Sequence, residues 1–261
     1  MGARTRLEPA SAEKSAAAGG SQRAPWLSAT LVLVSASVLG ACLFLAAVHV
    51  DDRYKLDHVS GARIALAQYV NDGTLYPELD GGQFYGGTRF MPLPILLHAA
   101  AAELTGEYLV SGKLLGYGAM AGLLALVYAL LRRLHCAPPL AVALVAAIIA
   151  TPTGLAAAMD LRADVLPLLL QVLAVAVVTR TQRPMATTAA ALLAALALFC
   201  KLNAVWAPLA IGVWLLMTDR RRLAWFAAVY GAFATVLLVL FVAATDGRIL
   251  ENVVGLSAAG V

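Results

Sequence analysis

The chain has 261 residues, of which 61% are hydrophobic and only 13% are charged, whereas an ordinary soluble domain carries roughly 25% charged residues. This composition excludes an ordinary soluble domain and predicts a protein of the lipid bilayer. The formal net charge is +4, but most basic residues flank hydrophobic runs, so membrane topology explains them better than binding to nucleic acid. The three cysteines, Cys42, Cys136 and Cys200, lie in or beside apolar segments without metal-ligand spacing, and we interpret them as small core residues.

Residues 1–25 are rich in Ala, Ser and Gly and predict a disordered cytoplasmic tail. The hydrophobic run at 27–50 is longer than the apolar core of a cleaved signal peptide, which has about 7–15 residues. It therefore predicts an uncleaved signal-anchor that opens a membrane domain over 26–245. Residues 246–261 are predicted to lie outside the cytoplasm.

Residues 51–106 predict a large first extracytoplasmic loop with short helices, because most of the acidic residues gather there. Its last part, from Pro92 to Leu104, is apolar but only 13 residues long. A crossing needs roughly 20 apolar residues, so this segment is expected to lie at the membrane interface or to re-enter it.

Further apolar runs follow at 109–131, 138–158, 163–179, 185–200, 203–217 and 223–245. They are apolar all round, which favours helices over the alternating strands of a membrane barrel. The predicted fold is all-α, a polytopic helical bundle with about seven spans. Around Lys201 the two adjacent runs are short, and one broken or strongly tilted arrangement remains an alternative.

Arginine clusters at 132–133, 180–183 and 220–222 test this topology, because Lys and Arg favour the cytoplasmic side of short loops. With a cytoplasmic N-terminus, all three clusters fall inside. The segments 51–90 and 160–164 then fall outside. We therefore predict an integral protein of the cell membrane whose active face is extracytoplasmic.

Charged residues of both signs gather at the predicted outer ends of the spans: Asp51, Asp52, Asp160, Arg162, Asp164 and Lys201. Each of them alone is equally well explained as an interfacial anchor. Together they suit group transfer from a phosphate-bearing lipid, because carboxylates can act as general bases while Arg and Lys can hold a phosphate.

Four sequence segments carry a resemblance to a known family through their order along the chain. They are DHVSGARIALAQYVNDGTLYP from Asp57, RFMPLPILLHAAAAELTG from Arg89, LRADVLPLLL around Arg162 and Asp164, and LFCKLNAVWAPLAI around Lys201. In this order they resemble the integral-membrane glycosyltransferases of the GT-C fold that use polyprenyl-phosphate-linked sugars, of the dolichyl- or polyprenyl-phosphate-mannose-transferase type. The resemblance covers roughly residues 26–244. It implies a hexosyl- or pentosyltransferase.

The resemblance implies that a loop carboxylate takes the proton from the acceptor hydroxyl as it attacks the anomeric carbon. Asp57 matches the family's position best, and Asp51 and Asp52 are the alternatives. His58 stands where a second acidic residue is common in the family, which leaves the use of a divalent metal ion open. No metal ligand is predicted.

The leaving group would be a lipid phosphate, and Arg89, Arg162 and Lys201 are the expected cations around it. Asp164 is expected to orient Arg162 or an acceptor hydroxyl. Three further residues are interpreted as structural rather than catalytic. Lys113 is expected to be a snorkelling lysine, although it could join the cations. Arg63 is expected on the polar face of a loop helix, and His98 as a packed or interfacial histidine.

The implied partners are a polyprenyl-phosphate-linked sugar donor, a glycan, lipid or protein acceptor, and the bilayer itself. Family members generally continue through more spans, so it stays open whether the sequence is the N-terminal part of a longer enzyme. A transporter or flippase of a lipid-linked substrate and a catalytically incomplete membrane scaffold are the alternatives. A transporter is the weaker one, because transporters often have paired repeats and bind substrate near the midplane, whereas these charges gather at one face.

Overall fold

The structure is a computed structural model that describes residues 25–53, 56, 58–78, 88–161 and 164–255. Within these ranges it is helical and contains no strand, which confirms the all-α prediction. The helices are α1 (Pro25–Val48), α2 (His58–Asn71), α3 (Pro92–Thr105), α4 (Tyr108–Arg133), α5 (Pro138–Ala150), α6 (Pro152–Met159), α7 (Val165–Arg180), α8 (Pro184–Cys200), α9 (Trp206–Thr218), α10 (Arg220–Ala244), α11 (Arg248–Leu250) and the π-helical turn η1 (Glu251–Gly255).

Among the described residues, three helices are long and apolar enough to cross a membrane, namely α1, α4 and α10. A fourth crossing results if α5 and α6 together form one span. The apolar helices α7, α8 and α9 have only 16, 17 and 13 residues. The helices thus support an integral membrane protein with three to four candidate spans, and the larger predicted number of about seven is not confirmed.

The apolar run at 138–158 is divided into two helices that meet at an angle of 73°. The break lies at Thr151, whose backbone is extended and whose Oγ1 accepts the N–H of Gly154 in the first turn of α6. Pro152 causes this, because a proline disfavours the helical conformation of the residue before it. Its own fixed φ suits the start of the next helix.

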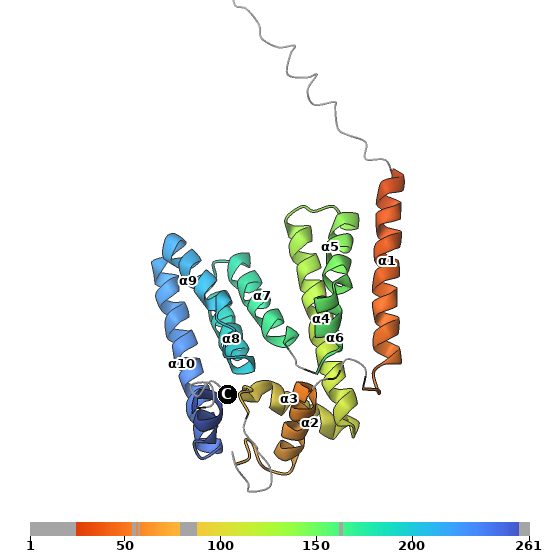
Figure 1. Ribbon diagram of the computed structural model, residues 1–261. Helices are drawn as coiled ribbons and strands as arrows, with labels where there is room; N and C mark the ends of the chain where they lie inside the picture. Colours follow the sequence, from red (N-terminus) through yellow and green to blue (C-terminus); the bar gives the residue numbers. More distant parts are fainter. Residues whose placement is uncertain (1–24, 54–55, 57, 79–87, 162–163, 256–261) are drawn as a thin grey trace, which may run out of the picture.

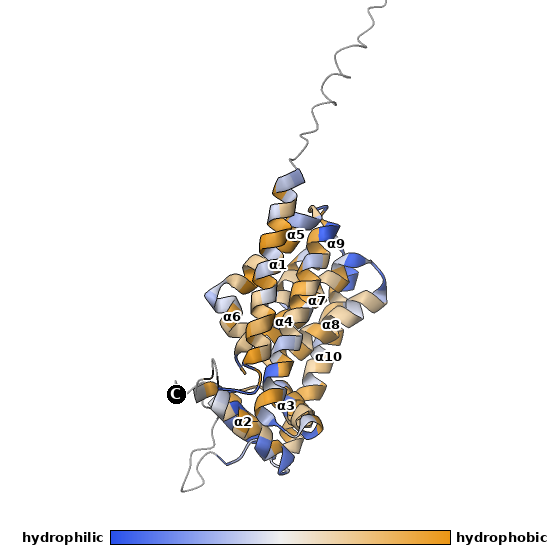
Figure 2. Cartoon of the chain, turned by 90° about the vertical axis from the view of Figure 1, so that its right-hand side faces the viewer, coloured by the Kyte–Doolittle hydropathy of each residue, from blue (hydrophilic) through white to orange (hydrophobic). Residues whose placement is uncertain are grey.

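The helices α1, α4, α5, α7, α8 and α10 run lengthwise through the bundle, and α2, α3 and α11 gather at one end of it (Figure 1). The connections α4–α5, α7–α8 and α9–α10 lie at the opposite end. The terminal turns at these connections carry Arg132 and Arg133 of α4, Arg180 of α7 and Arg220 of α10. Hydrophilic residues gather at both ends and hydrophobic ones between them (Figure 2), which is the pattern of a protein that faces lipid around its middle.

The helices α7, α8, α9 and α10 pack around alanines, including Ala174, Ala190 and Ala194, which are fully buried. Small side chains allow helices to approach closely, which is how helices associate where lipid is as apolar as the interface. A second cluster contains Leu66, Ile95, Phe199 and Ile249 and joins α2 and α3 to α8 and α11. This second cluster fixes the end of the bundle where the candidate site lies.

Candidate functional site

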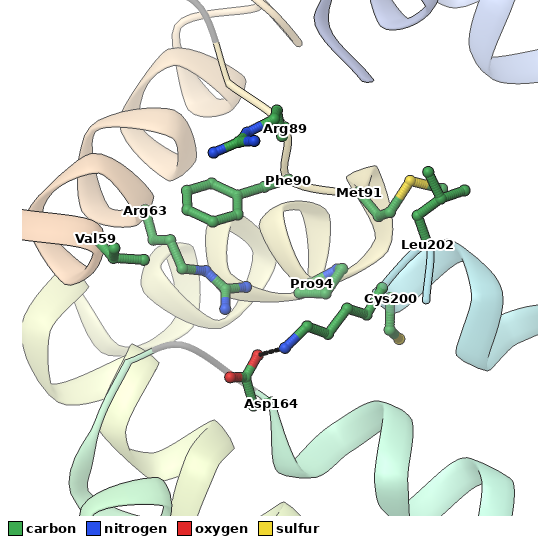
Figure 3. A pocket seen from close by; sticks show the side chains of 10 residues that line it. Val59, Arg63, Arg89, Phe90, Met91, Pro94, Asp164, Cys200 and Leu202 are labelled. Atoms are coloured by element: carbon green, nitrogen blue, oxygen red, sulfur yellow. Dashed lines mark hydrogen bonds and ion pairs between the residues drawn. The ribbon is translucent and has the colours of Figure 1, made fainter. Parts of the chain in front are cut away.

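A pocket of about 300 Å³ opens at the end of the bundle where α2 and α3 lie. Its polar lining consists of Arg63, Arg89, Asp164 and Lys201, and its apolar lining includes Phe90, Met91 and Leu202 (Figure 3). We call it the charged pocket. Three cations and one carboxylate give its lining a positive balance, which favours an anion.

Arg63 projects from α2 into the charged pocket and is only 5% exposed. Its guanidinium lies 5.7 Å from the centre of the Phe90 ring, a cation–π geometry. Burial lowers the pKa of Arg63 to about 10, while the negative charges of Asp164 and Asp160 act in the opposite direction. The side chain therefore remains cationic at neutral pH and presents a fixed donor to the pocket.

The placement of Arg63 differs from the expected polar face of a loop helix. The helix α2 packs against both α3 and α4, so one of its faces is enclosed. Ser60, Arg63 and Ala67 share that face, with exposures of 0%, 5% and 0%. Their spacing of three and four residues is the signal that sequence reasoning missed. Ser60 also donates a hydrogen bond to Asp160 Oδ1 at 2.6 Å, which ties α2 to the end of α6.

Lys201 and Asp164 bring two chain segments together on the other side of the charged pocket. Asp164 directly precedes α7 and makes no side-chain cap there, and Lys201 directly follows α8. Lys201 Nζ donates to Asp164 Oδ1 at 2.9 Å, and the two side chains are 45% and 44% exposed. Such an open pair has water as an alternative partner, so its charges remain accessible to a ligand.

Arg89 and Phe90 form the wall that precedes α3, and in Figure 3 the Phe90 ring lies between Arg89 and Arg63. Tyr76 supports this wall, because its buried hydroxyl donates to the Phe90 carbonyl at 2.7 Å. Burial raises the pKa of Tyr76, so it stays neutral and can donate. Arg248, from α11, donates in turn to the Tyr76 carbonyl at 3.0 Å.

The C-terminal segment contacts the wall a second time, since the backbone N–H of Thr88 donates to Asn252 Oδ1 at 2.9 Å. Residues far apart in sequence thus hold the segment that carries Arg89. Nothing in the sequence alone indicated these contacts of Arg248 and Asn252.

A second pocket of about 280 Å³ adjoins the charged pocket, with which it shares Met91 and Leu202. It lies between α8, α10 and the C-terminal turns, and its lining includes Phe199, Leu238 and Val253. Except for Thr235, its lining side chains are apolar. We call it the apolar groove. A charged pocket next to an apolar groove suits an amphipathic ligand.

The predicted site residues divide into three sets. Arg89, Asp164 and Lys201 come together in the charged pocket, as a common role requires. Asp57 and Arg162 lie outside the described residues. Asp51 and Asp52 are not among the residues that line the pocket.

Asp52 belongs to a different cluster, which is built around Lys113. The ammonium of Lys113 donates to the backbone carbonyls of His49 and Asp52 and lies 3.5 Å from the Asp52 carboxylate. Asp52 Oδ2 also lies 2.5 Å from His49 Nδ1. Lys113 is 0% exposed, so it does not snorkel to the interface as expected but anchors the segment after α1.

His98 is 3% exposed, and its Nε2 lies 2.7 Å from the Tyr108 carbonyl, which confirms its interpretation as a packed histidine. Among the described residues, no group of three or more His, Cys, Asp or Glu side chains is placed to hold a metal ion. The use of a divalent metal ion, which His58 left open, therefore stays an open question, and the described residues offer no candidate set of ligands for it.

No protein-family model, curated protein or solved structure matches the chain.

Proposed function

We propose that the protein is an integral membrane glycosyltransferase of the GT-C type that moves a sugar from a polyprenyl-phosphate donor to an acceptor. The observation that supports this best is the charged pocket, with Arg63, Arg89, Lys201 and Asp164, directly beside the apolar groove. A lipid-linked sugar has the same division into a charged phosphate and an apolar tail.

In this proposal the phosphate of the donor lies among the cations of the charged pocket. Arg63 is held in place by burial and by Phe90, so little side-chain entropy is lost when it binds an anion. Lys201 is already ordered by Asp164 and can shift from that carboxylate toward the phosphate. Breaking an exposed ion pair costs at most about 1 kcal/mol.

The first isoprene units of the donor would pass along the apolar groove by way of Met91 and Leu202. The groove adds little hydrophobic free energy, because the lipid that the tail leaves is equally apolar. Its contribution is shape, since it orients the phosphate end of the donor into the charged pocket.

As the bond between the anomeric carbon and the phosphate oxygen breaks, negative charge grows on the leaving phosphate, and the cations stabilise it. The acceptor hydroxyl attacks the anomeric carbon and gives its proton to a carboxylate, for which the resemblance suggests Asp57. A single displacement of this kind inverts the anomeric configuration.

We place this chemistry outside the cytoplasm. The charged pocket lies at the end of the bundle away from the arginine-bearing connections, and such connections favour the cytoplasmic side. The N-terminus is then cytoplasmic, as α1 starts at the arginine-bearing end.

The test is a pair of assays on the full chain reconstituted in vesicles. One assay measures binding of sugar-free polyprenyl phosphate, and the other measures transfer from polyprenyl-phosphate-linked hexoses and pentoses to extracted membrane acceptors. Wild type is expected to do both, Asp57→Asn to bind without transfer, and Lys201→Met to bind poorly.

The alternatives give different outcomes in the same assays. Donor that crosses the vesicle membrane without loss of its sugar would indicate a transporter or flippase. Absence of binding in wild type would overturn the proposal and favour a scaffold.

A further inference from the structure

A third pocket, of about 640 Å³, lies at the opposite end of the bundle, where α8 and α10 begin. Its polar lining consists of Gln182, Thr187, Asp219, Arg221 and Arg222, and the indole of Trp225 forms part of its wall. We call it the basic pocket. None of its lining residues belongs to the charged pocket.

Arg222 is the fixed cation of the basic pocket. Its Nε donates to Thr187 Oγ1 at 3.1 Å, and one terminal nitrogen donates to the carbonyls of Val178 and Thr181 at 3.3 and 3.4 Å. Its guanidinium also stacks over the Trp214 ring at 5.6 Å. Arg222 thus satisfies carbonyls at the end of α7, which would otherwise lack a partner, and its orientation is fixed before any ligand binds.

Two guanidinium groups and one carboxylate, that of Asp219, line the basic pocket, so its lining keeps a positive balance. Asp219 Oδ1 accepts the backbone N–H groups of Arg221 and Arg222, so this carboxylate caps α10. In the described part of the chain, neither guanidinium forms an ion pair. Arg180, the last residue of α7, and Arg183, directly before α8, are both exposed and add to the positive potential.

Trp225 gives the basic pocket an apolar side that faces outward. Its indole is 51% exposed, and its Nε1 donates to Thr188 Oγ1 at 2.9 Å, which holds the ring across α8 and α10. Met185, the second residue of α8, is 82% exposed. Amphipathic rings at this level of a membrane helix are typical of the boundary between headgroups and acyl chains.

We infer that the basic pocket binds the phosphate of an anionic glycerophospholipid from the surrounding leaflet. Arg221 is exposed, and its guanidinium can match two phosphate oxygens with paired hydrogen bonds. The half-buried Arg222 adds its positive charge and its remaining terminal nitrogen. Trp225 then lies beside the glycerol and the first methylene groups. Basic pockets between membrane helices recognise headgroups in this way.

The experiment uses the full chain reconstituted in vesicles with equal amounts of phosphatidylcholine and phosphatidylglycerol, followed by native mass spectrometry of the lipids that remain bound. Arg221→Gln removes one pocket cation. Arg133→Gln is the matched control, because Arg133 is also exposed at the arginine-bearing end but does not line the pocket. Wild type and Arg133→Gln are expected to retain phosphatidylglycerol preferentially, and Arg221→Gln to retain about fivefold less of it.

Three results would overturn the inference: no preference for phosphatidylglycerol in wild type, an equal loss in the two variants, or displacement of the lipid by an equal concentration of inorganic phosphate. The last result would identify a general anion site. If Arg221→Gln does not fold, Arg221→Lys keeps the charge but lacks the planar fork, and it is expected to lose part of the preference. Unchanged retention in Arg221→Lys would then contradict the paired phosphate contact.

Discussion

The ammonium of Lys201 lies 2.9 Å from the carboxylate of Asp164, although 37 positions separate the two residues. This contact joins the end of α8 to the start of α7 at the mouth of the charged pocket. Because both side chains are almost half exposed, the pair adds little to stability and leaves its charges available.

The first prediction separates binding from stability at this pair. Lys201→Met should change the free energy of unfolding by less than about 1 kcal/mol. It should weaken polyprenyl phosphate binding at least about tenfold, because a hydrogen bond to a charged group contributes about 1.5–3 kcal/mol. Titration in vesicles and unfolding in mixed micelles measure the two effects. Lys201→Arg should retain most of the binding, and wild-type affinity in Lys201→Met would show that Lys201 does not contact the phosphate.

The second prediction concerns Lys113, whose replacement should lower the stability of the protein, in contrast to replacement of Lys201. Lys113→Met removes the donor to the carbonyls of His49 and Asp52, and leaving a buried acceptor unsatisfied costs about 1–3 kcal/mol. The free energy of unfolding in mixed micelles should fall by about that amount. Arg53→Met is the control, because Arg53 lies exposed on the same connection. Equal effects of the two substitutions would argue against the buried anchor.

The third prediction is a pH dependence at His98. Burial lowers the pKa of His98 below 6.5, and the nearby charge of Arg63 lowers it further, while the hydrogen bond to the Tyr108 carbonyl acts in the opposite direction. The unfolded chain therefore takes up this proton at a higher pH than the folded protein. The contribution of neutral His98 is fully present above pH 6.5 and is lost as the pH falls below it.

Unfolding in mixed micelles between pH 7 and pH 5 checks this, with wild type losing stability as the pH falls. His98→Gln should have a shallower dependence, because glutamine can still offer an N–H to the carbonyl but does not titrate. His135→Asn, at an exposed residue with a φ of 59°, should keep the wild-type slope. A slope unaffected by His98→Gln would assign the pH dependence to another group.

The fourth prediction compares two glycines of α4. A methyl group on Gly112 would lie 1.8 Å from Leu161 Cδ2 and 2.8 Å from His98 Nε2, whereas one on Gly118 would have no atom within 4 Å. Gly112→Ala should therefore destabilise the protein by about 1–3 kcal/mol through overpacking. Gly118→Ala should be neutral or stabilise it by up to about 1 kcal/mol, because alanine is the better helix former. The same unfolding measurement would contradict the packing of α4 against His98 if both variants behaved alike.

The sequence by itself determined that the chain is helical and suited to a lipid bilayer. Continuous apolar runs are stable in lipid, and backbone N–H and C=O groups that lack water must form hydrogen bonds within a helix. Asp164 and Lys201 were selected as charges at the ends of apolar runs, and Arg89 through the family resemblance. The structure brings these three residues into one pocket. The run at 138–158 was predicted as one continuous segment, because apolar runs do not reveal where a helix bends or how many runs cross the membrane.

Only the tertiary structure decided which charged side chains line the same pocket and which are buried by helix packing. From the sequence, Arg63 was expected on the polar face of a loop helix and Lys113 as a snorkelling lysine, yet packing of α2 and α4 against their neighbours encloses both. The carbonyls that Lys113 and Arg222 satisfy belong to distant segments, and Tyr76 gains its support from Arg248 across 172 positions. Such contacts depend on how helices pack, which local sequence patterns do not encode.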